Sequence, residues 1–341
     1  MTFWSINIIA ALVAFSASAL FGFALIPFLK KLNFGQTILD VGPKWHKSKQ
    51  GTPIMGGFMF IFGSLLACCL GYSLYKKYLL GDLTDALRNN LLRVFTCMVF
   101  SVAFGILGFA DDYIKAVKKR NLGLRAKHKL LFQILFSAAL LKILYELGDK
   151  STEINLMFLK FDLGFFYYPI MLLVIIFVTN AVNLTDGVDG LCGSVTVITM
   201  LAIGTLCNIY SLPEVTIYSM CVAGAVMGFL LWNLHPAKVF MGDTGSMFLG
   251  GAFVAVSLTL HNHLLLILVG IVYIVEALSV VLQVISFKTT GKRIFKMSPI
   301  HHHFELNKWS EYKIVAVFSL ISILAAIIAI HTAYRFMPII D

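Results

Sequence analysis

The chain has 341 residues, of which 59% are hydrophobic and only 13% are charged, and its formal net charge is +10. About a quarter of the residues in a water-soluble globular protein are charged, so this composition excludes that class and indicates a polytopic membrane protein. The cations flank apolar runs and form no nucleic-acid-binding motif. We therefore expect anionic partners and a lipid bilayer, and no nucleic acid.

Ten apolar runs predict transmembrane helices, since about 20 apolar residues in a helix cross a bilayer. They lie near residues 4–29, 54–71, 91–110, 128–147, 164–182, 192–209, 215–232, 247–260, 264–287 and 313–334. The sequence shows no internal repeat and no low-complexity linker. We expect a single all-α helical-bundle domain over residues 1–341.

The positive charges predict the orientation of this bundle. Most of the 27 Lys and Arg residues fall in alternate loops, which also carry the polar motifs. Positively charged loops stay in the cytoplasm, so we expect both termini on the extracytoplasmic side. The active-site loops are then expected near residues 30–53, 111–130, 183–193, 233–246 and 288–312.

Two adjacent carboxylates, Asp111 and Asp112, end the third apolar run in the sequence FGILGFADDY. If the helix ends there, two anions lie beside its negative C-terminus, an arrangement that the helix dipole disfavours. A compensating positive group is expected, unless the acids simply cap the basic loop. The candidates are a divalent cation and the side chains of Lys115, Lys118, Lys119, Arg120, Arg125, Lys127 and Lys129.

Asp186 and Asp189 in LTDGVDG, and Asp243 in FMGDTGS, stand before the sixth and eighth predicted spans. Helix N-capping would explain Asp243 well and one of the other two. Both spans enter from the same face, so both direct their positive N-terminal ends at it and favour phosphate there. Because Mg²⁺ binds through one or two carboxylates and substrate oxygens, the five aspartates predict a magnesium and phosphate site.

Other polar residues carry two interpretations. His301, His302 and His303 cannot easily all ligate one zinc ion, so they are expected to donate to a pyrophosphate, to transfer a proton, or to lie in a solvated loop. Four residues, Lys47, Lys49, Thr52 and Lys127, could bind phosphate or set topology, and Phe240 could pack or stack on a base. Glu276 lies within an apolar run and should face the bundle interior.

The ordered motifs GTPIMGG, FADDY, NLTDGVDG, FMGDTGS and PIHHHFE resemble those of the phospho-N-acetylmuramoyl-pentapeptide transferase family. This family lies within the polyprenyl-phosphate N-acetylhexosamine-1-phosphate transferases. The resemblance implies Mg²⁺-dependent transfer of phospho-N-acetylmuramoyl-pentapeptide from its UDP-linked precursor to undecaprenyl phosphate, giving lipid I and UMP. It also implies a homodimer in the bacterial cell (inner) membrane, with the active site facing the cytoplasm.

The same resemblance implies roles for individual residues. Asp111 resembles the base that deprotonates the lipid phosphate, Asp112 supports the polar cluster, Asp243 resembles the principal Mg²⁺ ligand, and His301 resembles the histidine that assists at the pyrophosphate. The positions that match substrate-binding residues are Lys47, Thr52, Lys127, Asn183, Asp186, Asp189, Asn233 and Phe240, with Phe240 beneath the uracil.

The sequence leaves alternatives for the mechanism and for the function. A direct attack by the lipid phosphate is favoured over a phosphoryl-enzyme intermediate, because that phosphate is already a nucleophile. An ion-coupled transporter would concentrate its polar groups near the membrane midplane, whereas these acids lie at one face. A sister transferase using a simple UDP-N-acetylhexosamine would share the aspartates but not the triple histidine.

Overall fold

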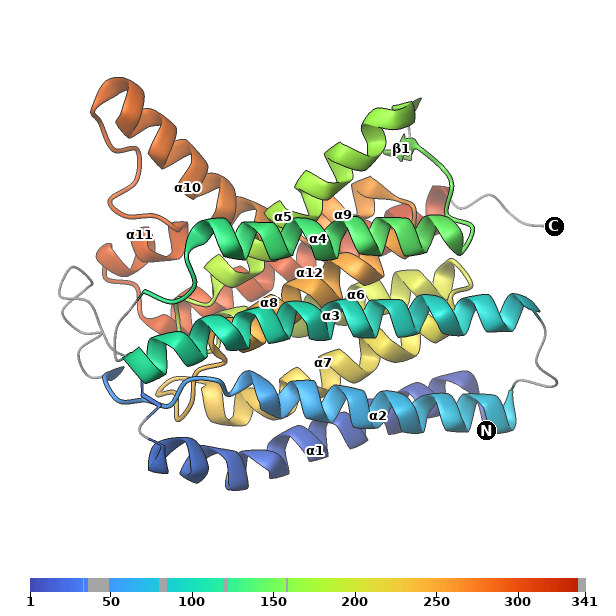
Figure 1. Ribbon diagram of the computed structural model, residues 1–341, viewed down its shortest axis with the longest axis horizontal. Coiled ribbons are helices and arrows are strands. Elements are labelled where there is room, and N and C mark those ends of the chain that lie inside the picture. The colour runs from blue at the N-terminus through green and yellow to red at the C-terminus, as the bar shows by residue number, and fades with distance from the viewer. Residues whose placement is uncertain (33, 36–48, 80–84, 119–121, 158, 337–341) are drawn as a thin grey trace.

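The computed structural model describes all residues of the chain except 33, 36–48, 80–84, 119–121, 158 and 337–341. The described part is almost entirely helical (Figure 1). The helices are α1 (Phe3–Lys31), α2 (Gly57–Tyr78), α3 (Asp85–Lys118), α4 (Ala126–Glu146), α5 (Tyr167–Thr185), α6 (Leu191–Ile209), α7 (Pro213–Asn233), α8 (Gly242–Thr259), α9 (His263–Val269), α10 (Ile271–Thr290), α11 (Ile300–Leu306) and α12 (Glu311–Phe336). Between α4 and α5, β1 (Glu153–Asn155) and β2 (Lys160–Asp162) form an antiparallel pair, followed by a 3₁₀ turn over Gly164–Phe166.

Nine helices in the described residues are long and apolar enough to cross a membrane, namely α1 to α7, α10 and α12. Helix α8 is shorter, with 18 residues, and it begins with the polar sequence GDTGS. Every residue from Thr244 to Thr259 is nevertheless buried, and α8 packs against α3 and α5. The bundle confirms the predicted all-α polytopic membrane protein.

Glycines bring α8 into close contact with α2 and α3. A Cβ on Gly108 would overlap the backbone carbonyl of Asp243, and a Cβ on Gly57 would overlap the backbone of Gly245. Small residues at such crossings let helix backbones approach each other closely. The N-terminus of α8, which carries Asp243, is thereby held against the part of α3 that carries Asp111 and Asp112.

The expected end of the third span at Ala110 is wrong. Helix α3 continues past the two aspartates to Lys118, so Asp111 and Asp112 do not lie at a helix C-terminus. The unfavourable helix-dipole argument therefore does not apply to them. The extra helical residues instead place Lys115 one turn beyond Asp111, on the same face of α3.

The continuous ninth span predicted over 264–287 is also wrong. The chain breaks at Gly270 into the short helix α9 and the longer helix α10. A Cβ at Gly270 would lie 3.0 Å from the ring of Phe253, so α8 packs directly against the break. Helix α10 then leaves the bundle at an angle, toward the upper left of Figure 1.

The ends of the described chain and its predicted active-site residues lie at opposite ends of the bundle. Helix α1 begins and α12 ends at the same end, which also holds the β1–β2 pair (Figure 1). The end of α3 and the starts of α6, α8 and α12 lie at the opposite end, with all of the predicted active-site residues that the structure describes. Which end faces the cytoplasm stays a prediction.

Candidate active site

Three carboxylates meet where α3 packs against the start of α8. Oxygens of Asp111, Asp112 and Asp243 all lie within 4.8 Å of one another. Asp111 and Asp112 are buried, at 4% and 3% exposed, whereas the side chain of Asp243 is 19% exposed. The sequence separates Asp243 from the other two by more than 130 residues, and the close crossing of α3 and α8 brings the three together.

Asp112 anchors the first turn of α8. Its Oδ2 accepts hydrogen bonds from the backbone N–H and the hydroxyl of Thr244, at 2.8 and 2.7 Å, and its Oδ1 accepts from the N–H of Asp243, at 3.1 Å. A carboxylate supplied by another helix thus satisfies N–H groups that have no partner within α8. Asp243 itself lies inside this first turn, after Met241 as the N-cap, so the N-capping interpretation of Asp243 is wrong.

Two lysines compensate the negative charge. The ammonium of Lys115 lies 2.5 Å from Oδ2 of Asp111 and 3.2 Å from Oδ2 of Asp243. Lys129, in the first turn of α4, lies 3.1 Å from the same oxygen of Asp243. A compensating positive group was expected, and these two members of the candidate set supply it. Asp111 also accepts the backbone N–H of Leu124 at 2.8 Å, which holds Leu124, just before α4, against the cluster.

The other oxygen of Asp243 is oriented by an amide. Asn183, near the end of α5, donates from Nδ2 to Oδ1 of Asp243 at 2.9 Å and to the hydroxyl of Ser246 at 2.8 Å. Asn183 was expected at a nucleotide-binding position. In the structure its amide connects α5 to the acidic cluster.

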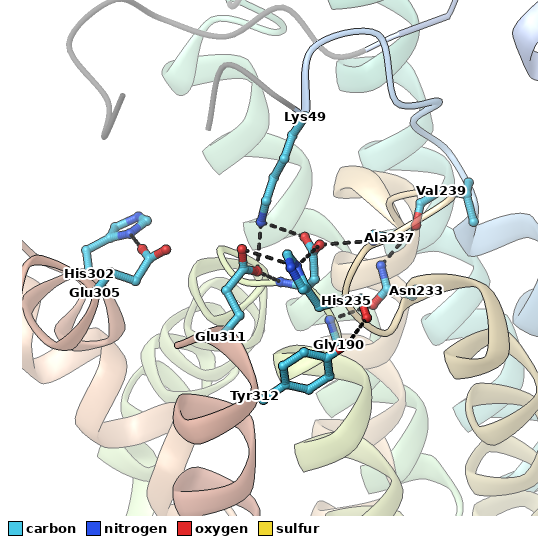
Figure 2. A network of polar contacts seen from close by, with 11 residues as sticks. Lys49, Gly190, Asn233, His235, Ala237, Val239, His302, Glu305, Glu311 and Tyr312 are labelled. Carbon is cyan, nitrogen blue, oxygen red and sulfur yellow. Dashed lines mark hydrogen bonds and ion pairs between the residues drawn. The ribbon is translucent and has the colours of Figure 1, made fainter. Parts of the chain in front are cut away.

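A second polar cluster lies beside the turn between α5 and α6 (Figure 2). The ammonium of Lys49 lies 2.7 Å from Asp189 and 2.8 Å from Glu311, at the start of α12. His235 Nδ1 lies 3.0 Å from Asp189 and 3.4 Å from Glu311. Asn233, at the end of α7, accepts from the N–H of Gly190 at 3.1 Å and donates to the carbonyl of Val239 at 2.9 Å. The cluster therefore joins four segments distant in sequence.

Asp186 lies between the two clusters. It follows the last residue of α5, while α6 begins after Gly190, whose φ is +77°. No side-chain hydrogen bond caps α6, so the N-capping interpretation is wrong for Asp186 and Asp189. Burial, together with the charges of Asp243 and Asp112, raises the pKa of Asp186 well above its ordinary value of 3.8. The turn therefore holds an acid that resists ionisation in this site.

The three histidines point to different partners. His301 is fully buried, and its Nδ1 lies 3.0 Å from the equally buried Glu276 of α10. Its Nε2 has no hydrogen-bond partner among the described residues and packs directly under Gly187. His302 pairs with Glu305 at 2.6 Å, and His303 accepts the N–H of Lys296 at 3.1 Å. These separate partners agree with the expectation that the triplet does not ligate one ion, and Glu276 faces the interior as expected.

The remaining predicted residues are less closely tied to the clusters. Phe240 is partly buried and bonds through its backbone to Pro53 and Gly56, both at 2.8 Å. Thr52, next to Pro53, is partly exposed, and Lys127 is exposed on the first turn of α4. Lys47 lies outside the described residues.

Glu311 and His235 were not predicted as site residues. A single acid at the start of a helix is common, and His235 was part of a loop without a recognisable motif. Their partners are remote in sequence, with Lys49 and Glu311 separated by 262 residues. The only available signal was their place in the loops of the same face.

Comparison with known proteins shows the family of the chain. The model of glycosyl transferase family 4 matches residues 94–261, which include the acidic cluster. The phospho-N-acetylmuramoyl-pentapeptide-transferase of Halalkalibacterium halodurans is 43% identical over 330 residues, covering 95% of this chain and 96% of that protein. The proteins of the same name from Bacillus subtilis and Bacillus cytotoxicus are 44% and 45% identical, covering 94% and 95% of this chain and 95% and 97% of their own lengths.

This similarity spans nearly the whole bundle and both polar clusters, and 665 curated proteins match the chain in all. At more than 40% identity over such lengths, chains share a fold and a family. The chain is therefore a multi-pass membrane transferase that belongs to the phospho-N-acetylmuramoyl-pentapeptide-transferase family.

Proposed function

We propose that this enzyme transfers phospho-N-acetylmuramoyl-pentapeptide from its UDP-linked donor to undecaprenyl phosphate, with Mg²⁺, giving lipid I and UMP. The observation that carries the proposal is the meeting of Asp111, Asp112 and Asp243 with the ammonium groups of Lys115 and Lys129 at one end of the bundle. Two phosphate-bearing reactants of like charge need such cations and a metal in order to approach each other. The site is proposed to face the cytoplasm of a bacterial inner membrane, in a homodimer.

The donor set of the cluster fits Mg²⁺. Carboxylate oxygens are the ligands that this ion prefers, and it needs only one or two of them beside substrate oxygens and water. Asp243 is proposed as the principal ligand because its side chain is the most exposed of the three. Lys115 already places a positive charge between Asp111 and Asp243, so this position favours a cation. When bound, Mg²⁺ would neutralise charge on the pyrophosphate and on the leaving UMP.

The other residues of the cluster have distinct proposed tasks. Asp111 is proposed to take the proton from the lipid phosphate, which then attacks the donor phosphorus directly. Asp112 is already bound to three donors at the start of α8, which supports a role in holding Asp243 rather than in chemistry. Lys115 and Lys129 are proposed to screen the phosphates of the two substrates. His301 is proposed to assist at the pyrophosphate, from its position under Gly187.

The nucleotide end of the donor is proposed to bind beside the turn between α5 and α6. Asn183, Asp186, Asp189 and Asn233 all lie on or against this turn. Phe240 is proposed to stack beneath the uracil, and the remaining proposed substrate contacts are Lys47, Thr52 and Lys127. Asn183 and Asn233 come from the ends of two different helices, and Asp186 and Asp189 come from the turn itself.

The test is release of UMP by the purified enzyme. It is given undecaprenyl phosphate with either UDP-N-acetylmuramoyl-pentapeptide or UDP-N-acetylglucosamine, in Mg²⁺ or in chelator. We expect UMP release only with the pentapeptide donor and not with UDP-N-acetylglucosamine. This release should depend on Mg²⁺ and be lost in Asp243→Ala. The matched control is Asp162→Ala, an exposed aspartate on β2 at the opposite end, which should retain full activity. Release with the simple hexosamine donor would assign the sister reaction, and no release with either donor would refute the proposal.

A further inference from the structure

Asp189 has three hydrogen-bond partners within its own chain, besides the contact of its backbone N–H. Its Oδ1 accepts from Lys49 at 2.7 Å, while its Oδ2 accepts from the backbone N–H of Ala237 at 3.0 Å and lies 3.0 Å from His235 Nδ1. The residue is only 4% exposed. Three contacts within the chain already hold this buried carboxylate, so Asp189 organises its neighbours whether or not it also contacts the nucleotide.

Glu311 completes that organisation from the first turn of α12. Its Oε2 accepts both the ammonium of Lys49, at 2.8 Å, and the backbone N–H of Asp189, at 3.0 Å. The adjacent Tyr312 donates its hydroxyl to the carbonyl of His235 at 2.5 Å. Figure 2 shows Glu311 and Tyr312 approaching Lys49 and His235 from α12. The last helix thus fixes both the turn after α5 and the loop after α7.

Lys49 is held between two carboxylates rather than by one. An ammonium has three N–H donors, and two of them are directed at Asp189 and Glu311. Burial alone would lower the pKa of Lys49, but its hydrogen bonds to the two acids outweigh burial and raise the pKa above its usual value. The side chain, 14% exposed, is therefore a fixed cation with one donor left for an acceptor on a ligand.

We propose that Glu311 is a positioning residue for the donor substrate: with Asp189 it holds Lys49 so that its remaining N–H meets an oxygen of the uridine diphosphate group. This inference rests on the proposed function, because it names the substrate end that this cluster serves. The undecaprenyl phosphate acceptor is not expected to depend on the cluster, since the acidic residues proposed for the chemistry lie on α3 and α8. Loss of Glu311 should therefore weaken binding of the UDP-linked donor and leave binding of undecaprenyl phosphate unchanged.

The experiment measures UMP release by the full-length enzyme while each substrate is varied in turn. Glu311→Gln keeps the size of the side chain but removes its charge, and we expect the KM for the UDP-linked donor to rise about tenfold, the scale of one lost charge-assisted hydrogen bond. The kcat and the KM for undecaprenyl phosphate should change by less than about twofold. Glu146→Gln is the matched control, because Glu146 forms an exposed ion pair with Lys142 at the opposite end of α4.

A second variant keeps the test valid if Glu311→Gln fails to fold. Lys49→Gln changes a loop residue and should raise the donor KM to a similar extent. If the two residues act as one unit, the double variant should be no worse than the more damaging single variant, since coupled effects are not additive. An unchanged donor KM in a folded variant, equal effects on both substrates, or additive effects would overturn the inference. Only inactivity of the unmodified enzyme would count against the proposed function.

Discussion

The carboxylate of Asp112, on α3, lies 2.8 Å from the backbone N–H of Thr244, in the first turn of α8. One residue thereby connects the helix that carries Asp111 to the helix that carries Asp243. Because a helix N-terminus needs acceptors for its free N–H groups, this contact stabilises α8 and sets the separation of Asp111 and Asp243. Asp112 therefore has a structural task in this site, whereas the chemistry is proposed for Asp111 and Asp243.

Replacing Asp112 should affect stability more than replacing Asp111. In Asp112→Asn, one acceptor oxygen becomes an NH₂ group that faces the N–H donors of Asp243 and Thr244. Leaving a buried donor without a partner costs about 1–3 kcal/mol, so we expect a lower melting temperature in detergent and greatly reduced UMP release. Asp111→Asn should lose UMP release with a smaller change in melting temperature. Equal melting temperatures for the two variants would contradict a structural role for Asp112.

Gly108 should be intolerant of a side chain. The Cβ of Gly108→Ala would overlap the carbonyl oxygen of Asp243, so α3 and α8 must move apart and the acidic cluster must widen. Overpacking of this kind costs about 1–3 kcal/mol. We expect lower stability and at least a tenfold loss of activity, measured as melting temperature and UMP release. Gly105→Ala, one turn away, is the matched control: its Cβ would lie 3.3 Å from Phe248 Cβ, so it should lose much less stability and activity than Gly108→Ala.

The apolar runs were sufficient to predict the bundle. A membrane-spanning segment must form all its backbone hydrogen bonds within itself, so it is a helix that its length and apolar composition reveal. They could not locate every boundary. The run around Gly270 is apolar on both sides, and the break arises where that glycine packs on Phe253, a tertiary contact that a local pattern does not contain. The extension of α3 beyond Asp112 was missed because charged residues look like a loop.

The site was only partly predictable for the same reason. Asp186, Asp189 and Asp243 stand in glycine-flanked motifs that differ from their apolar surroundings, which singles them out. The alternation of loops between the two membrane faces then predicted that they lie at the same face. Glu311 has no such context, since an acid in the first turn of a helix is ordinary. Its contacts with Lys49 and Asp189 depend on how α12 packs against the bundle. Pairings across the whole chain need the folded structure.

His301 should support the turn after α5 through Glu276. His301→Ala would remove the ring beneath Gly187 and leave the buried Glu276 without its 3.0 Å partner. Leaving a buried polar group without its hydrogen-bond partner costs about 1–3 kcal/mol, so we expect a lower melting temperature as well as a loss of UMP release. His303→Ala, whose ring is only partly buried, is the control and should lose less stability than His301→Ala. An inactive but fully stable His301→Ala would instead indicate a purely chemical role.

The stability of the enzyme should fall with rising pH through Asp186. Burial, followed by the charges of Asp243 and Asp112, raises the pKa of this carboxyl above 3.8, so the folded state keeps a proton that the unfolded state has released. Between those two pKa values the free energy of unfolding falls by about 1.4 kcal/mol for each pH unit. Asp186→Asn cannot ionise. Its melting temperature should therefore exceed that of the unmodified protein by more at pH 8 than at pH 5, in chelator, although UMP release is lost.

The control for this pH effect is Asp162→Asn. Asp162 is exposed, and its hydrogen bonds with Thr152 and Gly164 lower its pKa, so the carboxyl is ionised in both folded and unfolded states throughout this range. The difference in melting temperature between Asp162→Asn and the unmodified protein should thus be the same at pH 5 and pH 8. If Asp186→Asn also gave a constant difference, Asp186 would be ionised in the folded protein at pH 5, and the neighbouring cations would outweigh its burial.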